Sequence, residues 1–171
     1  DDKIAEIIRS CRVHGMGRNK YENIRIGMTG RLDTLQAVVL GAKLDIFADE
    51  LVHRQNAADR YAALLEGMVG TPSLGAGVTS SWAQYVIQLP QGSDRNAICK
   101  SLANSGVPTA IYYPVPMHRQ PPYAHYPVSA CNLSVTMDLC DHVLALPMHP
   151  YLETAQQAHM ANSLKDALAP A

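Results

Sequence analysis

Apolar residues recur at helical spacing in the first part of the chain. Ile4, Ile7 and Ile8 fall on one face of a helix predicted over residues 2–12. From residue 32 to about residue 69 there is no proline, and leucine, valine and isoleucine recur every three or four positions. This pattern predicts a long helix of roughly 55 Å at 1.5 Å per residue. A helix of that length is expected either to break near residues 47–50 or to bridge two domains, and the bridge is the favoured interpretation.

Strand and helix patterns alternate in the remainder of the chain. Aromatic and β-branched residues predict a strand over residues 81–89, and Ser93 or Asp94 is positioned to cap a helix that ends at residues 104–106. A second strand is predicted over residues 109–113, followed by a loop that contains five prolines between Pro114 and Pro127. Further helices are expected over residues 135–144 and 155–168. This order of strands and helices along the chain indicates an α+β fold, with helices packed on a small sheet.

Charged residues on the long helix are expected to form its solvated face. Glu50 and Arg54 stand four residues apart in the favourable order, and Asp59 and Arg60 add charge to the same side. Asp33 stands where a helix N-cap would satisfy free backbone N–H groups. The sequence therefore predicts a helix that begins near residue 34 and keeps these four charges in water.

Composition excludes several classes of function. The 171 residues are 47% hydrophobic and 17% charged, and 14 Lys plus Arg against 15 Asp plus Glu give a net charge of −1. Neither nucleic acid nor an acidic membrane surface is an expected partner of a chain with this balance. No apolar run approaches the ~20 residues of a membrane span. The chain opens on Asp1 and enters a helical pattern at once, which predicts an excerpt of a longer protein.

Cysteine and histidine spacings indicate neither a metal site nor a redox site. The four cysteines form no CxxC pair, so they are interpreted as thiols in a reducing cytosol. Histidine pairs occur seven residues apart, whereas two helical metal ligands usually stand four apart. We therefore expect a cytoplasmic protein without a bound metal. The four cysteines are Cys11, Cys99, Cys131 and Cys140.

Arg31 is the first candidate binding residue. Gly27 and Gly30 precede it, and two glycines so close together indicate a close approach of the backbone to another group. A guanidinium at the start of a helix offers a fork of donors to a carboxylate or a phosphate. A simple ion pair of Arg31 with Asp33 or with a neighbouring acid is an equally good interpretation of the pattern alone.

A second candidate segment runs from residue 111 to residue 118. Adjacent strand residues face opposite sides, so Tyr112 and Tyr113 cannot both lie in the core. At least one hydroxyl is then available to a ligand or to another subunit, and the prolines that follow present His118 on a stiff turn. An edge strand with aromatic rings at its rim explains the same pattern without any ligand.

These segments resemble the C-terminal portion of the DegT/DnrJ/EryC1/StrS family, the fold-type I, pyridoxal-phosphate-dependent nucleotide-sugar aminotransferases. Within the family the chain is most similar to enzymes that aminate a UDP-linked 3-keto sugar uronic acid. The matching segments run in family order over nearly the whole chain; they are residues 12–15 with Tyr21, 27–37, 54–61, 82–85, 112–118 and 144–150.

The resemblance implies a function and a set of site residues. It implies a homodimer with active sites at the interface, glutamate as amino donor, and a nucleotide-linked keto sugar made for cell-surface polysaccharide or lipopolysaccharide. Arg31 matches the arginine that reaches the substrate across the interface, and Tyr112, Tyr113 and His118 match the lining of the sugar-nucleotide site. Thr29 stands where the family has an asparagine that contacts the cofactor phosphate, and threonine keeps one hydroxyl donor but loses the reach of the amide.

The resemblance also implies that no catalytic residue lies in this chain. The Schiff-base lysine of the family belongs upstream of Asp1, and none of the five lysines matches its context; they are Lys3, Lys20, Lys43, Lys100 and Lys165. Residues 1–45 would then be the end of the large cofactor-binding domain and the start of the long helix, and residues 46–171 the small domain. The chain alone is expected to be inactive. The alternative hypothesis is a non-catalytic dimerisation or interaction domain, in which the tyrosines are packing residues.

Overall fold

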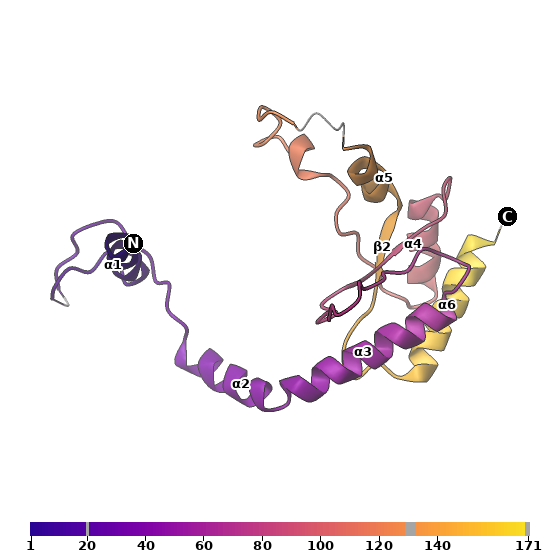
Figure 1. Ribbon diagram of the computed structural model, residues 1–171, viewed down its shortest axis with the longest axis horizontal. Helices are drawn as coiled ribbons and strands as arrows, with labels where there is room; N and C mark the ends of the chain where they lie inside the picture. Colours follow the sequence, from indigo (N-terminus) through magenta and orange to yellow (C-terminus); the bar gives the residue numbers. More distant parts are fainter. Residues whose placement is uncertain (20, 129–132, 170–171) are drawn as a thin grey trace. The chain divides into compact units, whose positions relative to one another are not determined.

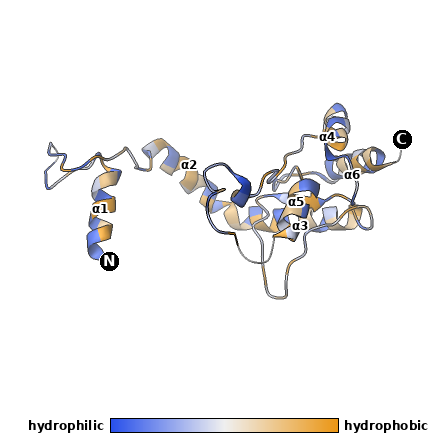
Figure 2. Ribbon diagram, turned by 90° about the horizontal axis from the view of Figure 1, so that it is seen from above, coloured by the Kyte–Doolittle hydropathy of each residue, from blue (hydrophilic) through white to orange (hydrophobic). Residues whose placement is uncertain are grey.

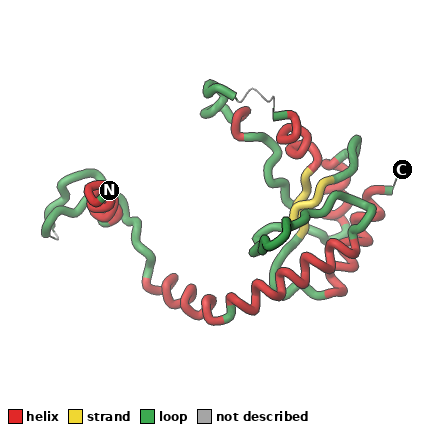
Figure 3. Tube along the Cα trace, viewed as in Figure 1, coloured by secondary structure: helices red, strands yellow, loops and turns green. Residues whose placement is uncertain are grey.

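The computed structural model describes residues 1–19, 21–128 and 133–169. The chain divides into two compact units, Asp1–Phe47 and Ala48–Ala171, here called the N-terminal and C-terminal units, and each is described by itself. Figure 1 follows the chain through its helices and strands, and Figure 3 shows how much of it is loop. The predictions made for Lys20 and Cys131 lie outside the described residues.

The N-terminal unit begins with the predicted helix. Helix α1 (Asp2–Arg12) is capped by Asp1, whose carboxylate accepts a hydrogen bond from the Lys3 N–H at 2.9 Å. A loop follows and is closed by isolated antiparallel bridges that pair Val13 with Thr29 and Met16 with Asn23. The unit ends with helix α2 (Thr34–Asp45).

The prediction of one continuous helix over residues 32–69 is wrong. The chain forms two helices, α2 and α3 (Phe47–Leu64), with Ile46 between them. The Ile46 N–H donates to the Leu44 carbonyl, so the i to i−4 ladder of hydrogen bonds stops at this residue. Asp33 occupies the N-cap position of α2, but its side chain makes no capping hydrogen bond. The break therefore comes just before the predicted window, at a position with neither glycine nor proline to mark it.

A two-stranded antiparallel sheet lies in the C-terminal unit. Strands β1 (Tyr85–Gln88) and β2 (Val143–Leu146) pair with Tyr85 opposite Leu146 and Gln88 opposite Val143. Helix α4 (Arg95–Asn104) packs against helix α6 (Thr154–Leu168), and the short elements η1 (Met117–Arg119) and α5 (Ser134–His142) lie between the strands in sequence. The most deeply buried side chains of the core include Tyr61, Leu65, Tyr85, Ile87, Leu102, Leu144 and Leu164.

The predicted positions of the second strand and of one helix end are corrected by the structure. In the segment 109–113 only Ala110 pairs, exchanging two backbone hydrogen bonds with Ala145 at 3.2 and 2.7 Å. Prolines on both sides of the segment remove the N–H groups that a longer ladder would use. The second strand is β2, which occupies the predicted end of the helix over residues 135–144. Four consecutive apolar residues are compatible with either a buried strand or a buried helix, so the periodicity could not decide.

The charged side chains of α3 do not all face solvent as predicted. Glu50 is buried and accepts a hydrogen bond from the Tyr151 hydroxyl at 2.6 Å. Arg54 donates to the Trp82 carbonyl at 2.9 Å, and Arg60 donates to the Leu152 carbonyl at 2.9 Å. These side chains attach α3 to loops that are distant in the sequence, which a helical charge pattern cannot reveal. Within the described residues, none of the helices combines the length and apolarity that crossing a bilayer requires.

Candidate functional site

The loop that carries Thr29 is built on a close approach of two glycines. Gly15 adopts a φ of +74°, and a Cβ placed there would lie 1.7 Å from the Arg25 carbonyl oxygen. A Cβ on Gly27 would lie 2.2 Å from the Gly15 nitrogen. The sequence predicted that the backbone at Gly27 comes close to another group. That group is the backbone of Gly15, in another part of the same loop. This contact fixes the path of the backbone that leads to Thr29.

Thr29 is exposed and held by its backbone neighbours. The Met28 N–H donates to the Cys11 carbonyl at 2.8 Å, and the Gly30 N–H donates to the Arg12 carbonyl at 2.8 Å. The Thr29 Oγ1 lies 3.3 Å from His14 Nε2. A hydroxyl in this setting is able to accept from the imidazole and still donate to a phosphate oxygen. The exposed hydroxyl of Thr29 is therefore able to offer one hydrogen-bond donor to a ligand.

Arg31 leads from this loop into α2. Its side chain is exposed, and within residues 1–19, 21–128 and 133–169 it forms no ion pair with Asp33. The sequence left an internal ion pair and a ligand contact as equal alternatives. The geometry leaves the five N–H donors of the guanidinium available to a carboxylate or a phosphate.

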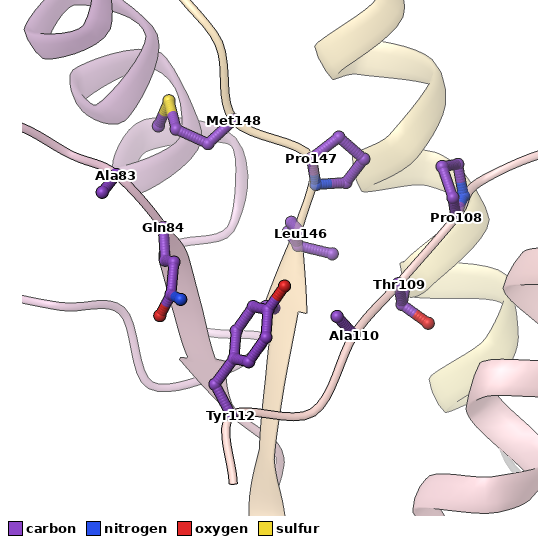
Figure 4. A pocket seen from close by; sticks show the side chains of 10 residues that line it. Ala83, Gln84, Pro108, Thr109, Ala110, Tyr112, Leu146, Pro147 and Met148 are labelled. Carbon is purple, nitrogen blue, oxygen red and sulfur yellow. The ribbon is translucent and has the colours of Figure 1, made fainter. Parts of the chain in front are cut away.

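A pocket of about 300 Å³ opens on one face of the sheet in the C-terminal unit (Figure 4). Tyr112 covers one side of it, and the Gln84 carboxamide lies beside the Tyr112 ring. The residues that line it are Ala83, Gln84, Pro108, Thr109, Ala110, Tyr112, Ala145, Leu146, Pro147 and Met148. Three sequence segments thus meet here: the two residues before β1, the loop that ends at Tyr112, and the end of β2 with the two residues after it.

The structure brings Tyr112 and Tyr113 together but does not place His118 with them. The two phenol rings pack edge to face with centroids 5.7 Å apart. Tyr112 is 39% exposed and Tyr113 67%, so neither belongs to the core. His118 lies on η1, half-buried, and does not line the pocket. Thr29 and Arg31 belong to the N-terminal unit, whereas the other three predicted residues belong to the C-terminal unit.

Two buried tyrosines support the pocket from behind. The Tyr61 hydroxyl donates to the carbonyl of Pro147, a lining residue, at 2.9 Å. The Tyr61 and Tyr85 rings stack with centroids 4.9 Å apart. Burial, reinforced by the Asp59 carboxylate, raises the pKa of Tyr85 to about 12, and burial followed by the neighbouring Tyr85 raises the pKa of Tyr61 above that of a free phenol. Both phenols are therefore neutral at physiological pH and act as structural supports.

Sequence reasoning missed the polar residues that share the pocket with Tyr112. Gln84 and Thr109 were not candidates, although Gln84 stands inside a segment already singled out. The alternation of the strand contained a usable signal, because Gln84 precedes the buried Tyr85 and must face the opposite side. Thr109 had no such signal, since the segment around it forms a single bridge and no strand.

Lysines and metal ligands do not gather at this site. The lysines within the described residues are exposed, and none lines the pocket beside Tyr112; they are Lys3, Lys43, Lys100 and Lys165. The described part of the chain contains no group of three or more His, Cys, Asp or Glu side chains placed to hold a metal ion. Among the chain's own residues, the site offers hydrogen bonds and aromatic surface.

Comparison with known proteins shows which family the chain matches. A model of the DegT/DnrJ/EryC1/StrS aminotransferase family matches residues 1–165. A UDP-2-acetamido-2-deoxy-3-oxo-D-glucuronate aminotransferase of Pseudomonas aeruginosa is 40% identical over 156 residues, which cover 91% of this chain and 42% of that protein. A UDP-N-acetyl-3-dehydro-alpha-D-glucosamine 3-aminotransferase of Acidithiobacillus ferrooxidans is 34% identical over 169 residues, covering 98% of this chain and 44% of that protein.

Solved structures show the same relationship. The crystal structure of a DegT DnrJ EryC1 StrS aminotransferase from Brucella abortus superimposes with a TM-score of 0.83 and 41% sequence identity. The match covers 97% of this chain and 44% of that chain. This chain therefore spans less than half the length of each of these three relatives.

Proposed function

Because this chain belongs to the DegT/DnrJ/EryC1/StrS aminotransferase family, we propose that it is the C-terminal part of a pyridoxal-phosphate-dependent sugar aminotransferase. The proposed reaction moves an amino group from glutamate to a nucleotide-linked keto sugar destined for cell-surface polysaccharide. The observation that carries the proposal is the match of the family over residues 1–165. In the proposed protein, residues 1–45 end the large domain and residues 46–171 form the small domain.

The names of the two curated relatives narrow the substrate class. Both act on UDP-linked sugars that carry an acetyl-substituted nitrogen and a keto group at carbon 3. The more similar of the two acts on a uronic acid, which adds a carboxylate to the sugar. We take a UDP-linked 2-acetamido-3-keto sugar uronic acid as the proposed acceptor.

Arg31 is the proposed anchor for the negative charge of this substrate. Its guanidinium is exposed and free of an ion pair with Asp33 within the described residues, so no internal contact has to be broken before it binds. A paired fork of N–H donors matches the two oxygens of a carboxylate, and the same donors suit a phosphate. In the proposed homodimer it would reach the active site of the partner subunit.

The C-terminal unit supplies the proposed contacts to the rest of the substrate. Tyr112 lines the pocket on the sheet, and Tyr113 presents a more exposed ring beside it. Phenols offer both a flat surface and a hydrogen-bonding hydroxyl, which suits a sugar or a base. His118 is proposed for the same site from the family alone, since it lies outside the pocket.

We propose that this chain contacts the cofactor but does not attach it covalently. Pyridoxal phosphate, when bound, supplies the aldehyde chemistry that accepts and releases an amino group. The Thr29 hydroxyl would contribute one donor to its phosphate. The lysine that attaches it would lie outside these 171 residues, so the chain by itself would not catalyse the reaction.

The proposal is tested with the complete gene product, glutamate and a UDP-linked 2-acetamido-3-keto sugar uronic acid. Mass spectrometry of the nucleotide sugar should detect replacement of the keto oxygen by an amino group. The R31A variant should raise the KM for the nucleotide sugar by roughly 10- to 100-fold, because a hydrogen bond to a charged group contributes about 1.5–3 kcal/mol. The R9A variant, which removes an exposed arginine from α1, is the matched control.

The second candidate function is a non-catalytic interaction domain. Its support is the exposure of apolar side chains on α2, none of whose residues is buried. A complete gene product that dimerises but neither binds UDP sugars nor forms the amino sugar would favour this alternative. Amino sugar formation by the wild-type protein would exclude it.

A further inference from the structure

The pocket beside Tyr112 is lined without a single charged side chain. Its polar groups are the Gln84 carboxamide and the hydroxyls of Thr109 and Tyr112, and its other lining residues are alanine, proline, leucine and methionine. A pocket in the N-terminal unit gives a contrast within the same chain, since Arg9, Arg18 and Arg25 line it with Glu6. The neutral lining fits an uncharged group, because a phosphate or carboxylate placed there would lose water without gaining a cation.

Gln84 is presented to the pocket by the strand that follows it. Tyr85 is almost fully buried and pairs with Leu146, so the preceding residue faces the other side of the sheet. Figure 4 shows the Gln84 carboxamide beside the Tyr112 ring. Within the described part of the chain, neither the carboxamide nor the Tyr112 hydroxyl has a hydrogen-bond partner in the protein. Both are therefore available to a ligand.

The size of the pocket limits the ligand to one ring or substituent. Pockets for drug-sized ligands run from about 300 to 1,000 Å³, and this pocket, at about 300 Å³, is at the small end. A complete nucleotide sugar would extend well beyond it. One neutral part of such a molecule fits, with its charged diphosphate outside.

We propose that Gln84 is a specificity-determining residue that binds a neutral amide group of the nucleotide sugar in this pocket. The proposal rests on the proposed function. A carboxamide offers two N–H donors and a carbonyl acceptor, which complement the C=O and N–H of an amide. A nucleotide sugar has two sources of this chemistry: the acetamido substituent of the sugar and the imide edge of a pyrimidine base. When a ligand without an amide group fills the pocket, the Gln84 carboxamide loses its hydrogen bonds to water and gains none in return. The pocket therefore discriminates against nucleotide sugars that lack the amide group.

The experiment measures the affinity of the complete gene product for three probes by calorimetry at one salt concentration. The probes are UDP-N-acetylglucosamine, UDP-glucose and uridine. The Q84A variant removes the carboxamide, and the Q84E variant keeps its size while replacing the N–H donors by a charged oxygen. Q91A is the matched control, because Gln91 is an exposed glutamine just beyond the other end of β1 that does not line the pocket.

If the pocket binds the acetamido group, Q84A weakens UDP-N-acetylglucosamine by about fivefold and leaves UDP-glucose and uridine unchanged. If it binds the base, Q84A weakens all three probes by a similar factor. In both cases Q84E weakens the same probes at least as much and Q91A none. Wild-type affinities in Q84A and Q84E for all three probes would overturn the assignment of Gln84. A wild-type protein that binds no UDP probe would overturn the proposed function, and this inference with it.

Discussion

Residues 1–47 and residues 48–171 differ in how much of their apolar surface they bury. Helices α1 and α2 contain no buried residue, and Figure 2 shows hydrophobic residues spread along α2. In the C-terminal unit, α3, both strands, α4 and α6 contribute to one core. Each unit also contains a pocket, and the two pockets differ in charge. Arginines line the pocket of the N-terminal unit, whereas only uncharged side chains line the pocket beside Tyr112 in the C-terminal unit. A helical pattern of apolar residues therefore predicts a helix, but it does not say whether the apolar face is buried within the same unit.

The largest expected difference between the units is in the cost of removing a leucine. Leu144 lies in β2 and is 0% exposed, whereas Leu35 on α2 is 79% exposed. Leu144→Ala should lower the free energy of unfolding by about 3 kcal/mol, because it removes buried methyl groups and leaves a cavity. Leu35→Ala should change it by less than about 0.5 kcal/mol. Urea denaturation of the two variants measures the contrast, and equal costs would contradict it.

A glycine substitution tests whether the N-terminal loop is held by its own close approach. Gly15→Ala should cost about 2 kcal/mol of local stability, since the residue has a positive φ and a carbonyl oxygen in the space of its Cβ. Gly77→Ala is the matched control, because Gly77 has a φ of +73° but no atom within 4 Å of its Cβ position. Hydrogen exchange should show lost protection at the Met28 and Gly30 amides in the first variant alone. Unchanged protection there would mean that the loop does not depend on this contact.

Two buried tyrosines of the C-terminal unit should respond differently to loss of the hydroxyl. Tyr61→Phe removes a hydrogen bond to the Pro147 carbonyl and should lower the free energy of unfolding by about 1 kcal/mol. The buried Tyr85 hydroxyl has no partner among the described residues. Tyr85→Phe should therefore be neutral or raise stability by up to about 1 kcal/mol. Thermal unfolding of both variants decides the point, and a loss in Tyr85→Phe would reveal a partner for that hydroxyl.

The last expected effect is an alkaline loss of stability caused by the buried Tyr85. The pKa of Tyr85 rises from 10.0 in the unfolded chain to about 12 in the folded one, so between these values the folded state binds more protons than the unfolded state. The contribution of Tyr85 to stability should consequently be constant below pH 10 and fall as the pH rises toward 12. Denaturation at a series of pH values should show a shallower fall in Tyr85→Phe. An identical fall in the variant would exclude Tyr85 as its source.

Much of the local structure follows from sequence because it depends on neighbouring residues. Helix α1 and α6 have the predicted limits to within a residue, and Asp94 caps α4 by accepting from the Asn96 and Ala97 N–H groups at 3.0 Å. These features depend on spacing along a few turns. The expectation that Tyr112 and Tyr113 do not both lie in the core is confirmed, but not for the stated reason, since the segment forms no strand and both rings are exposed.

Features that depend on distant contacts were not predicted. The apolar run of β2 becomes a strand because β1 and Ala110 pair with it from positions far away in the sequence. Glu50 is buried and accepts a hydrogen bond from the Tyr151 hydroxyl, 101 positions along the chain. Gln84 became a candidate only when the pocket joined it to Tyr112. Each of these contacts is set by tertiary packing, which a local pattern does not contain.

The most direct test of the account locates the lysine that attaches the cofactor. The complete gene product is incubated with pyridoxal phosphate, reduced with borohydride, digested and mapped by mass spectrometry. We predict a single labelled lysine that lies outside these 171 residues, with none of the label on the chain described here. Stoichiometric label on one of its own lysines would contradict the account; these are Lys3, Lys20, Lys43, Lys100 and Lys165.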